Sequence, residues 1–192
     1  MNLNLIFSSF YSSVKIDSDL AQIEKYAYEL EAKDKGRQKS NRGGWQSNDL
    51  GLLDLSPEVH SLVKNLVNNA STVIEYCKFV GKIGLHNIWI NINRSKDYNN
   101  PHTHPNSLIS GTFYVKVPAC SGKLVFETPN NTLQHYLTPE IKEYNEVNST
   151  EWSFIPEPGI AVYFPSYLRH YVEPNKSEED RISIAFNLGI IK

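Results

Sequence analysis

Residues 87–93, NIWININ, alternate isoleucines with other side chains, and this alternation decides the fold class of the chain. A period of two is that of a strand, so the isoleucines share one face and Trp89, Asn91 and Asn93 share the other. Similar stretches, rich in β-branched and aromatic residues and separated by Pro, Gly, Asn and Ser, follow at 107–117, 122–128, 151–157, 159–166, 168–174 and 181–191. Short strands in succession, without helices between them, predict a mainly β sandwich or jelly roll.

Two helical stretches precede these strands. Asp17 or Ser18 can cap a first helix, in which apolar residues recur at spacings of three and four. Ser56 is a good N-cap for a second helix, with Pro57 at its first position and an apolar stripe that runs to Cys77. We expect both helices to cover one face of the sheet. We therefore expect a single domain over 1–192, with helical support in 1–80 and the jelly-roll core in 85–192.

The composition is that of an ordinary globular chain of 192 residues, with 40% hydrophobic and 21% charged residues and a formal net charge of -2. This charge favours neither a nucleic acid nor a membrane surface as a partner. Cys77 and Cys120 lack metal-type spacing, and the N-terminus does not have the pattern of a signal peptide. We expect a cytoplasmic protein, and the outer face of an edge strand could support a homodimer.

The stretch PHTHPN, residues 101–106, places two histidines two apart just before a strand-like run. Side chains two apart on a strand share a face, so His102 and His104 have the spacing of metal ligands. A pair of surface histidines in a polar loop explains the HxH pattern equally well. A third histidine, His170, lies among aromatic residues in a later strand-like stretch.

Arg181 and Ser183 are two apart on a predicted strand and therefore share a face. An arginine directed into the protein needs an anion, and its planar fork matches a carboxylate. The serine hydroxyl can add a further hydrogen bond. The alternative is an ion pair of Arg181 with one of the acidic residues just before it, Glu178, Glu179 and Asp180.

The order of these parts resembles the Fe(II)/2-oxoglutarate-dependent dioxygenases, whose usual motif is His-x-Asp/Glu, a distal His and then Arg-x-Ser. The chain is similar, in particular, to a bacterial and phage family of 2-oxoglutarate-Fe(II) oxygenases, over residues 41–47, 102–118, 122–126, 158–175 and 181–187. The resemblance implies a cupin-like double-stranded β-helix, Fe(II), and 2-oxoglutarate as cosubstrate. It also implies an enzyme that hydroxylates its substrate and releases succinate and CO2.

The resemblance implies that Fe(II) is held by His102, His104 and His170, with no catalytic residue beyond the metal centre, and that Arg181 and Ser183 bind the cosubstrate. Tyr114 either adds a hydrogen bond to the cosubstrate or belongs to the core. Asn91 and Asn93 either line the same cavity or face solvent. Trp45 and Asn106 are further candidates for the substrate or pocket.

The chain departs from the family pattern where a carboxylate is usual. In one register His102 is the first ligand and His104 replaces the acid; PHTHPN then resembles the PHxGxTN stretch of the aspartyl/asparaginyl β-hydroxylases, which has no carboxylate at that position. In the other register His104 is the first ligand and Asn106 replaces the acid. We favour the first, because a neutral amide is a poor ligand for Fe(II).

Two other functions stay open from the sequence. A three-histidine iron dioxygenase without 2-oxoglutarate leaves Arg181 and Ser183 unexplained, and a non-catalytic jelly-roll binding module is favoured only by the missing carboxylate. The substrate can be a peptidyl side chain, a nucleotide or a small metabolite, and analogy with the nearest families favours the peptidyl side chain. The segments 32–51 and 129–150, the second with His135, are candidate lid or substrate-binding elements.

Overall fold

The computed structural model describes residues 4–130 and 140–191. The helices of this part are α1 (Leu20–Glu31), the short 3-10 helix η1 (Leu52–Asp54) and α2 (Pro57–Tyr76). The strands are β1 (Ser12–Lys15), β2 (Asn41–Arg42), β3 (Trp45–Gln46), β4 (Lys82–Asn93), β5 (Tyr98–His102), β6 (Ile109–Lys116), β7 (Leu124–Glu127), β8 (Glu151–Phe154), β9 (Ile160–Pro165), β10 (His170–Val172) and β11 (Arg181–Ile191).

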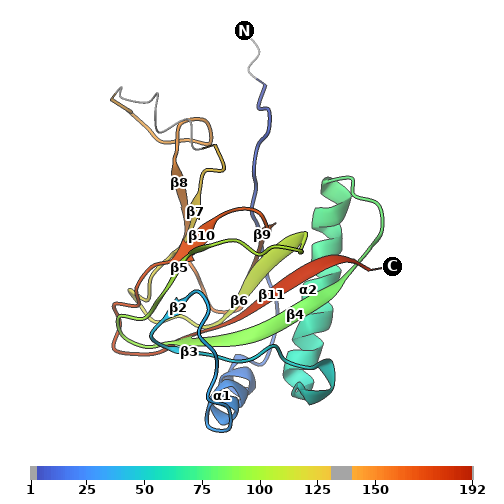
Figure 1. The fold of residues 1–192 in the computed structure, drawn as a ribbon, viewed down its shortest axis with the longest axis vertical. Helices are drawn as coiled ribbons and strands as arrows, with labels where there is room; N and C mark the ends of the chain where they lie inside the picture. The colour runs from blue at the N-terminus through green and yellow to red at the C-terminus, as the bar shows by residue number, and fades with distance from the viewer. Residues whose placement is uncertain (1–3, 131–139, 192) are drawn as a thin grey trace.

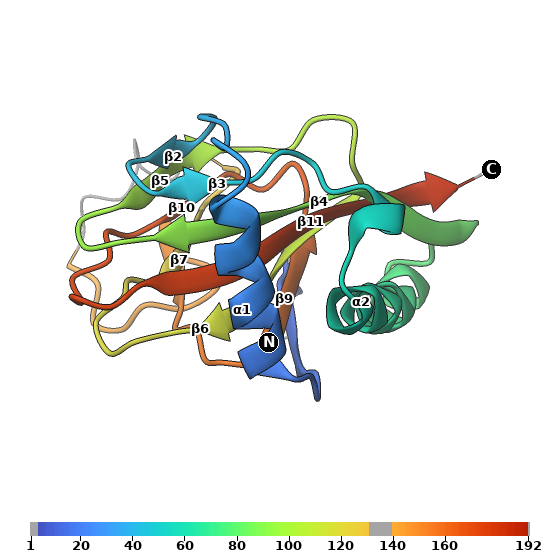
Figure 2. The same cartoon turned by 90° about the horizontal axis from the view of Figure 1, so that it is seen from below.

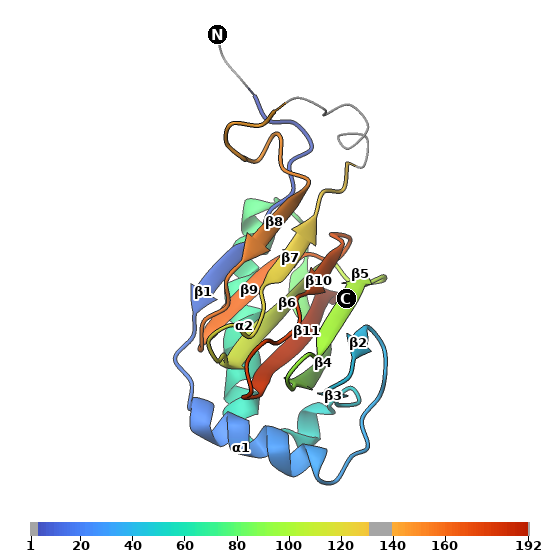
Figure 3. The ribbon, with the colours of Figure 1, turned by 90° about the vertical axis from the view of Figure 1, so that its left-hand side faces the viewer.

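The described strands form two antiparallel sheets that lie face to face (Figure 1, Figure 3). The six-stranded sheet has the order β1-β9-β6-β11-β4-β3, and the five-stranded sheet has the order β2-β5-β10-β7-β8. In Figure 3 the five-stranded sheet lies in front, the six-stranded sheet behind it, and α2 behind both. The predicted mainly β, double-stranded β-helix fold with N-terminal helices is confirmed. The predicted division at residues 80 and 85 stays a prediction, and β1 to β3 add strands to the first part.

The helices cover the outer face of the six-stranded sheet, as Figure 2 shows from below. Ile88, Ile90 and Ile92 of β4 are fully buried in one core cluster with apolar residues of α2 such as Leu62 and Leu66. Ser56 caps α2 as predicted, since its hydroxyl accepts a hydrogen bond from the Val59 amide. The predicted cap of α1 is wrong by one or two residues: Asp19 is the N-cap, and its carboxylate accepts from the Gln22 amide at 3.1 Å.

The inner face of the six-stranded sheet carries the polar half of NIWININ. Trp89, Asn91 and Asn93 are buried there and line a cavity between the two sheets. The second alternative for the asparagines, an exposed face, therefore does not hold. No helix in the part of the chain described here is long and apolar enough to span a membrane. Cys77 and Cys120 are both free thiols.

Candidate metal and cosubstrate site

Three histidines converge at one end of the five-stranded sheet. β5 ends at His102 and β10 begins at His170, and these two residues are directly opposite each other in the ladder. His104 follows in the turn after β5, where its amide donates to the Ser166 carbonyl at 2.9 Å. One ring nitrogen from each histidine lies within 4.8 Å of the others. The turn thus carries His104 back toward the strand pair that holds the other two.

The backbone orients two of these rings for a metal. His102 Nδ1 lies 2.7 Å from the Asn100 carbonyl, and His170 Nδ1 lies 2.8 Å from the Leu168 carbonyl. A carbonyl only accepts, so each Nδ1 carries the proton and each Nε2 keeps its lone pair. Burial lowers the pKa of His102 and His170, and burial followed by the charge of His102 lowers the pKa of His104 to about 4. All three rings are therefore neutral near pH 7, the form that binds a metal.

The spacing of the nitrogens fits one metal ion. His104 Nε2 and His170 Nε2 are 3.2 Å apart. Two nitrogens bound at right angles to one ion, each at roughly 2.1 Å, are about 3.0 Å apart. Imidazole ligands suit iron as well as zinc, copper and nickel, so the donor set is compatible with Fe(II).

Arg181 lies in the same cavity and is almost fully buried, with 1% of its surface exposed. Its Nη1 donates to the carbonyl oxygens of Ser121 and Glu173. Its Nη2 is buried and has no hydrogen-bond partner among the described residues. Burial lowers the pKa of the Arg181 guanidinium. Arginine side chains nevertheless stay protonated in proteins, so Arg181 is a cation at pH 7. A buried cation with an unpaired nitrogen marks a place for an anion.

Two of the three acidic residues just before Arg181 have other partners. Glu179 pairs with Lys116 at 3.8 Å, and Asp180 accepts from the Tyr28 hydroxyl at 3.0 Å. No ion pair of Arg181 is found in residues 4–130 and 140–191. The alternative in which Arg181 pairs with its own neighbours in sequence is therefore not supported.

A polar row on the inner face of the six-stranded sheet lies beside Arg181. Ser183 is opposite Asn91 of β4 on one side and opposite Tyr114 of β6 on the other. All three line the cavity, as does Asn93, which is opposite Arg181. Burial raises the pKa of Tyr114 above its ordinary value, so its hydroxyl stays protonated and can donate. The Asn91 Oδ1 is buried without a partner in the described part of the chain.

Two predicted pocket residues are not brought to this cavity. Trp45 lies in the hydrophobic core on the helix side of the sheet, and its Nε1 donates to the Asp34 carbonyl at 2.9 Å. Asn106 is exposed in the turn between β5 and β6, with a φ of 67°. The histidine cluster includes His102, which the first register requires as a ligand. His135 lies outside the described residues.

Trp89 is a site residue that sequence reasoning missed. Its ring stacks on His104 with centroids 5.7 Å apart, and the Arg37 guanidinium lies 5.8 Å from the centre of the Trp89 ring. Its position offered a signal, because it shares a strand face with Asn91 and Asn93. The stack limits the rotation of the His104 ring.

Residues 87–187, more than half of the 192 residues, match the model of the family described as "Putative 2OG-Fe(II) oxygenase". The chain belongs to this family. The metal and cosubstrate of this 2OG-Fe(II) oxygenase are accordingly Fe(II) and 2-oxoglutarate, and the converging histidines and the unpaired arginine nitrogen fit both. A comparison with curated protein sequences finds no match.

Solved structures share the fold of this 2OG-Fe(II) oxygenase at low sequence identity. A prolyl-4-hydroxylase from Pseudomonas putida is 11% identical, with a TM-score of 0.68, 95% of this chain covered and 93% of that chain. The epimerase SnoN from nogalamycin biosynthesis is 13% identical, with a TM-score of 0.71 and coverages of 95% and 79%. The viral collagen prolyl hydroxylase of Paramecium Bursaria Chlorella virus-1, in its 2OG complex, is 14% identical, with a TM-score of 0.61 and coverages of 94% and 96%.

Proposed function

We propose that this oxygenase hydroxylates a peptidyl side chain, with Fe(II) held by His102, His104 and His170. The far carboxylate of 2-oxoglutarate is bound by Arg181 and Ser183, and Tyr114 adds a third hydrogen bond. The observation that carries the proposal is the unpaired Nη2 of Arg181, buried in the cavity that the three histidines also line. A jelly-roll module without a cosubstrate would leave this charge buried at a cost of several kcal/mol, roughly 3–5.

The residues of the site have two roles, to bind the metal and cosubstrate and to orient them. Fe(II) with 2-oxoglutarate supplies the oxidation of a C–H bond by O2, with release of succinate and CO2. Arg181 and Ser183 fix one end of the cosubstrate, and the backbone carbonyls of Asn100 and Leu168 keep the protons of two histidines on Nδ1. Apolar side chains that line the cavity, including Leu124 and Phe164, exclude water from it.

The choice of a peptidyl substrate is supported by similar solved structures. Two of the similar proteins are prolyl hydroxylases, one of them a viral collagen prolyl hydroxylase. Their identity to this chain is low, so they support the choice by analogy of fold. The same fold also occurs in an epimerase and a carbocyclase from nogalamycin biosynthesis, so a small molecule is the competing substrate class.

The test is a titration of the protein with Fe(II) and then 2-oxoglutarate in the absence of oxygen, followed by its visible spectrum. We expect a charge-transfer band that saturates with 2-oxoglutarate. Arg181→Gln should keep iron but need about 100-fold more 2-oxoglutarate, because a buried charge-assisted contact is worth roughly 2–5 kcal/mol. Ser183→Ala should need about tenfold more, since one hydrogen bond to a charged group contributes roughly 1.5 kcal/mol.

Arg169→Gln is the matched control, because Arg169 is a half-exposed arginine whose partner is Glu127 on the surface. Iron binding without a band would contradict the role of Arg181 and favour a three-histidine dioxygenase that does not use 2-oxoglutarate. Loss of iron binding in His102→Ala, His104→Ala and His170→Ala, but not in Arg169→Gln, would locate the metal at the cluster.

A further inference from the structure

A second cavity, of about 600 Å³, opens beside the histidine cluster. Its walls are the N-terminal segment before β1, the ends of β7 and β8, and residues 146–150. Phe126 and Leu168 are buried at its base. Both also contact the metal site: the Phe126 ring lies 6.4 Å from the His170 ring, and the Leu168 carbonyl accepts from His170 Nδ1. One wall thus separates this cavity from the proposed iron.

The strand register shows how close the cavity lies to the metal site. One row of paired residues crosses four neighbouring strands. His102 of β5 is opposite His170 of β10, His170 is opposite Phe126 of β7, and Phe126 is opposite Trp152 of β8. Directly paired residues of antiparallel strands project to the same face, so Trp152 shares the inner face with the histidines. Strands are about 4.8 Å apart, which places Trp152 on the order of 10 Å from His170.

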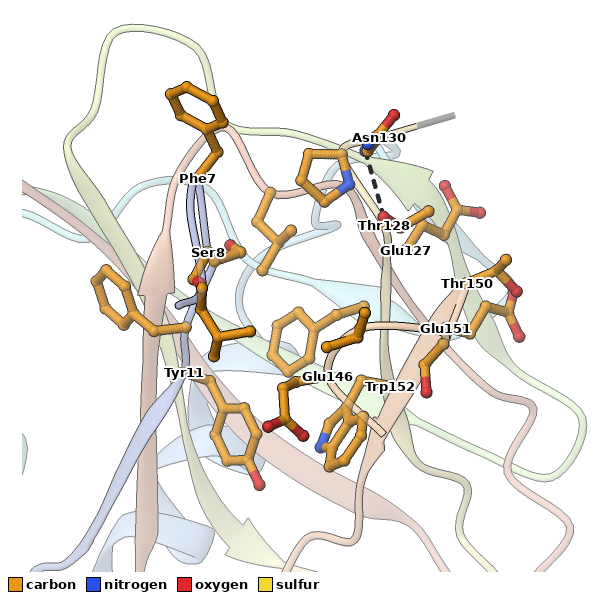
Figure 4. Close-up of a pocket in the computed structure, with 18 of the residues that line it drawn as sticks. Phe7, Ser8, Tyr11, Glu127, Thr128, Asn130, Glu146, Thr150, Glu151 and Trp152 are labelled. Carbon is orange, nitrogen blue, oxygen red and sulfur yellow. Dashed lines mark hydrogen bonds between the residues drawn. The ribbon is translucent and has the colours of Figure 1, made fainter. Parts of the chain in front are cut away.

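The lining combines aromatic rings with a free negative charge. Tyr11 stacks on Phe126 with centroids 5.7 Å apart, and Figure 4 shows the Glu146 carboxylate between the Tyr11 ring and the Trp152 indole. Every charged residue in the lining is a glutamate. Glu127 pairs with Arg169 at 2.8 Å and Glu151 accepts from the Tyr171 hydroxyl at 3.3 Å, whereas the Glu146 side chain has no ion pair or hydrogen bond within the described residues.

We propose that this cavity binds a lysine or arginine side chain of the polypeptide substrate, close in sequence to the residue that is hydroxylated. The apolar stem of such a side chain fits the walls, and its charge fits Glu146 and the faces of Tyr11 and Trp152. An extended peptide advances about 3.3 Å per residue, so the cation lies within about three residues of the reacting one. The proposal rests on the peptidyl hydroxylase function and narrows its substrate class.

The test is a binding measurement on the full chain without iron, so its outcome is independent of turnover. The probes are fluorescein-labelled heptapeptides of alanine and leucine whose central residue is lysine, norleucine or glutamate, followed by fluorescence anisotropy. We expect the lysine peptide to bind about tenfold more tightly than the norleucine peptide and the glutamate peptide to bind most weakly. Competition by Nα-acetyl-lysine amide should be far weaker than competition by the unlabelled lysine peptide.

Two variants distinguish the contribution of the Glu146 charge from that of the aromatic wall at Trp152. Glu146→Gln should reduce the preference for lysine over norleucine to about threefold or less, while Trp152→Ala should weaken both peptides. Glu143→Gln, at an exposed glutamate outside the lining, should change neither. Equal binding of the lysine and norleucine peptides, an unchanged preference in Glu146→Gln, or no binding of any peptide would overturn the proposal. Equal potency of the free lysine amide would assign the cavity to a small cation instead. The charge-transfer band with 2-oxoglutarate can appear or fail independently of all these outcomes.

Discussion

His104 gives the proposed iron site an unusual charge. With three neutral imidazoles, the protein ligands would contribute no negative charge to Fe(II), so only the carboxylate of 2-oxoglutarate nearer the metal would offset that charge, because the far carboxylate pairs with Arg181. Attraction between opposite charges is strong in a buried site. Binding of the cosubstrate should therefore depend more strongly on the metal here than in a site that already holds a carboxylate.

The two registers of PHTHPN share His104 as a ligand and make different predictions for mutants of His102 and Asn106. His104→Ala should weaken iron binding by about 100-fold or more, since losing even a partner of a ligand costs 10–100-fold. Asn106→Gly should leave iron affinity unchanged, and glycine suits the positive φ of this turn. Anaerobic titration with Fe(II) measures both. A defective Asn106→Gly together with normal iron binding in His102→Ala would instead support the second register, in which His104 is the first ligand and Asn106 replaces the acid.

The site residues were predictable from the sequence where they belong to a short motif with a fixed spacing. His170, Arg181 and Ser183 lie where the Arg-x-Ser motif and the distal histidine lead one to expect them. Trp45 was a poor candidate because a tryptophan that follows two glycines gives no information on which face of the sheet it will pack. Trp89 was overlooked because its contact, the His104 ring, comes from a turn whose course the sequence does not determine.

At the scale of elements, local signals predicted α2 well and β5 poorly. The cap, the proline and the apolar stripe of α2 all lie within one segment. The residues of β5, YNNPH, are polar and contain a proline, which speaks against a strand. What makes them a strand is pairing with β10 and β2, which lie far away in the chain. Tertiary contacts of this kind override local propensity.

The N-cap of α2 offers a stability test at the scale of one element. Ser56→Ala should lower the free energy of unfolding by about 1 kcal/mol, because the Val59 amide loses its acceptor. Ser56→Asp should stay close to the original stability, since its carboxylate accepts the same hydrogen bond and suits the positive end of the helix. Urea denaturation followed by circular dichroism measures the difference. If Ser56→Ala and Ser56→Asp were equally destabilised, the hydroxyl would matter for packing and not for capping.

Across the whole molecule, the two sheets supply different halves of the proposed site. The histidines belong to the five-stranded sheet and the turn after β5, whereas Arg181, Ser183 and Tyr114 belong to the six-stranded sheet. In the proposed site, iron alone would contact one half. Iron with 2-oxoglutarate would connect both halves, because the proposal puts one end of the cosubstrate at the metal and the other at Arg181.

This division predicts how ligands change thermal stability. At 100 times its dissociation constant, a ligand that binds only the folded state contributes about 2.7 kcal/mol, which raises the melting temperature of a chain of this size by roughly 5–10 °C. In the absence of oxygen, we expect Fe(II) to raise the melting temperature by one step of this size. We expect 2-oxoglutarate to raise it by a second step only when iron is present. A chelator should reverse both steps.

Arg181→Gln should keep the step from iron and lose the step from 2-oxoglutarate, whereas Arg169→Gln should keep both. Scanning fluorimetry measures all of these, and a 2-oxoglutarate step that persists in Arg181→Gln would mean that the cosubstrate is held by one sheet alone.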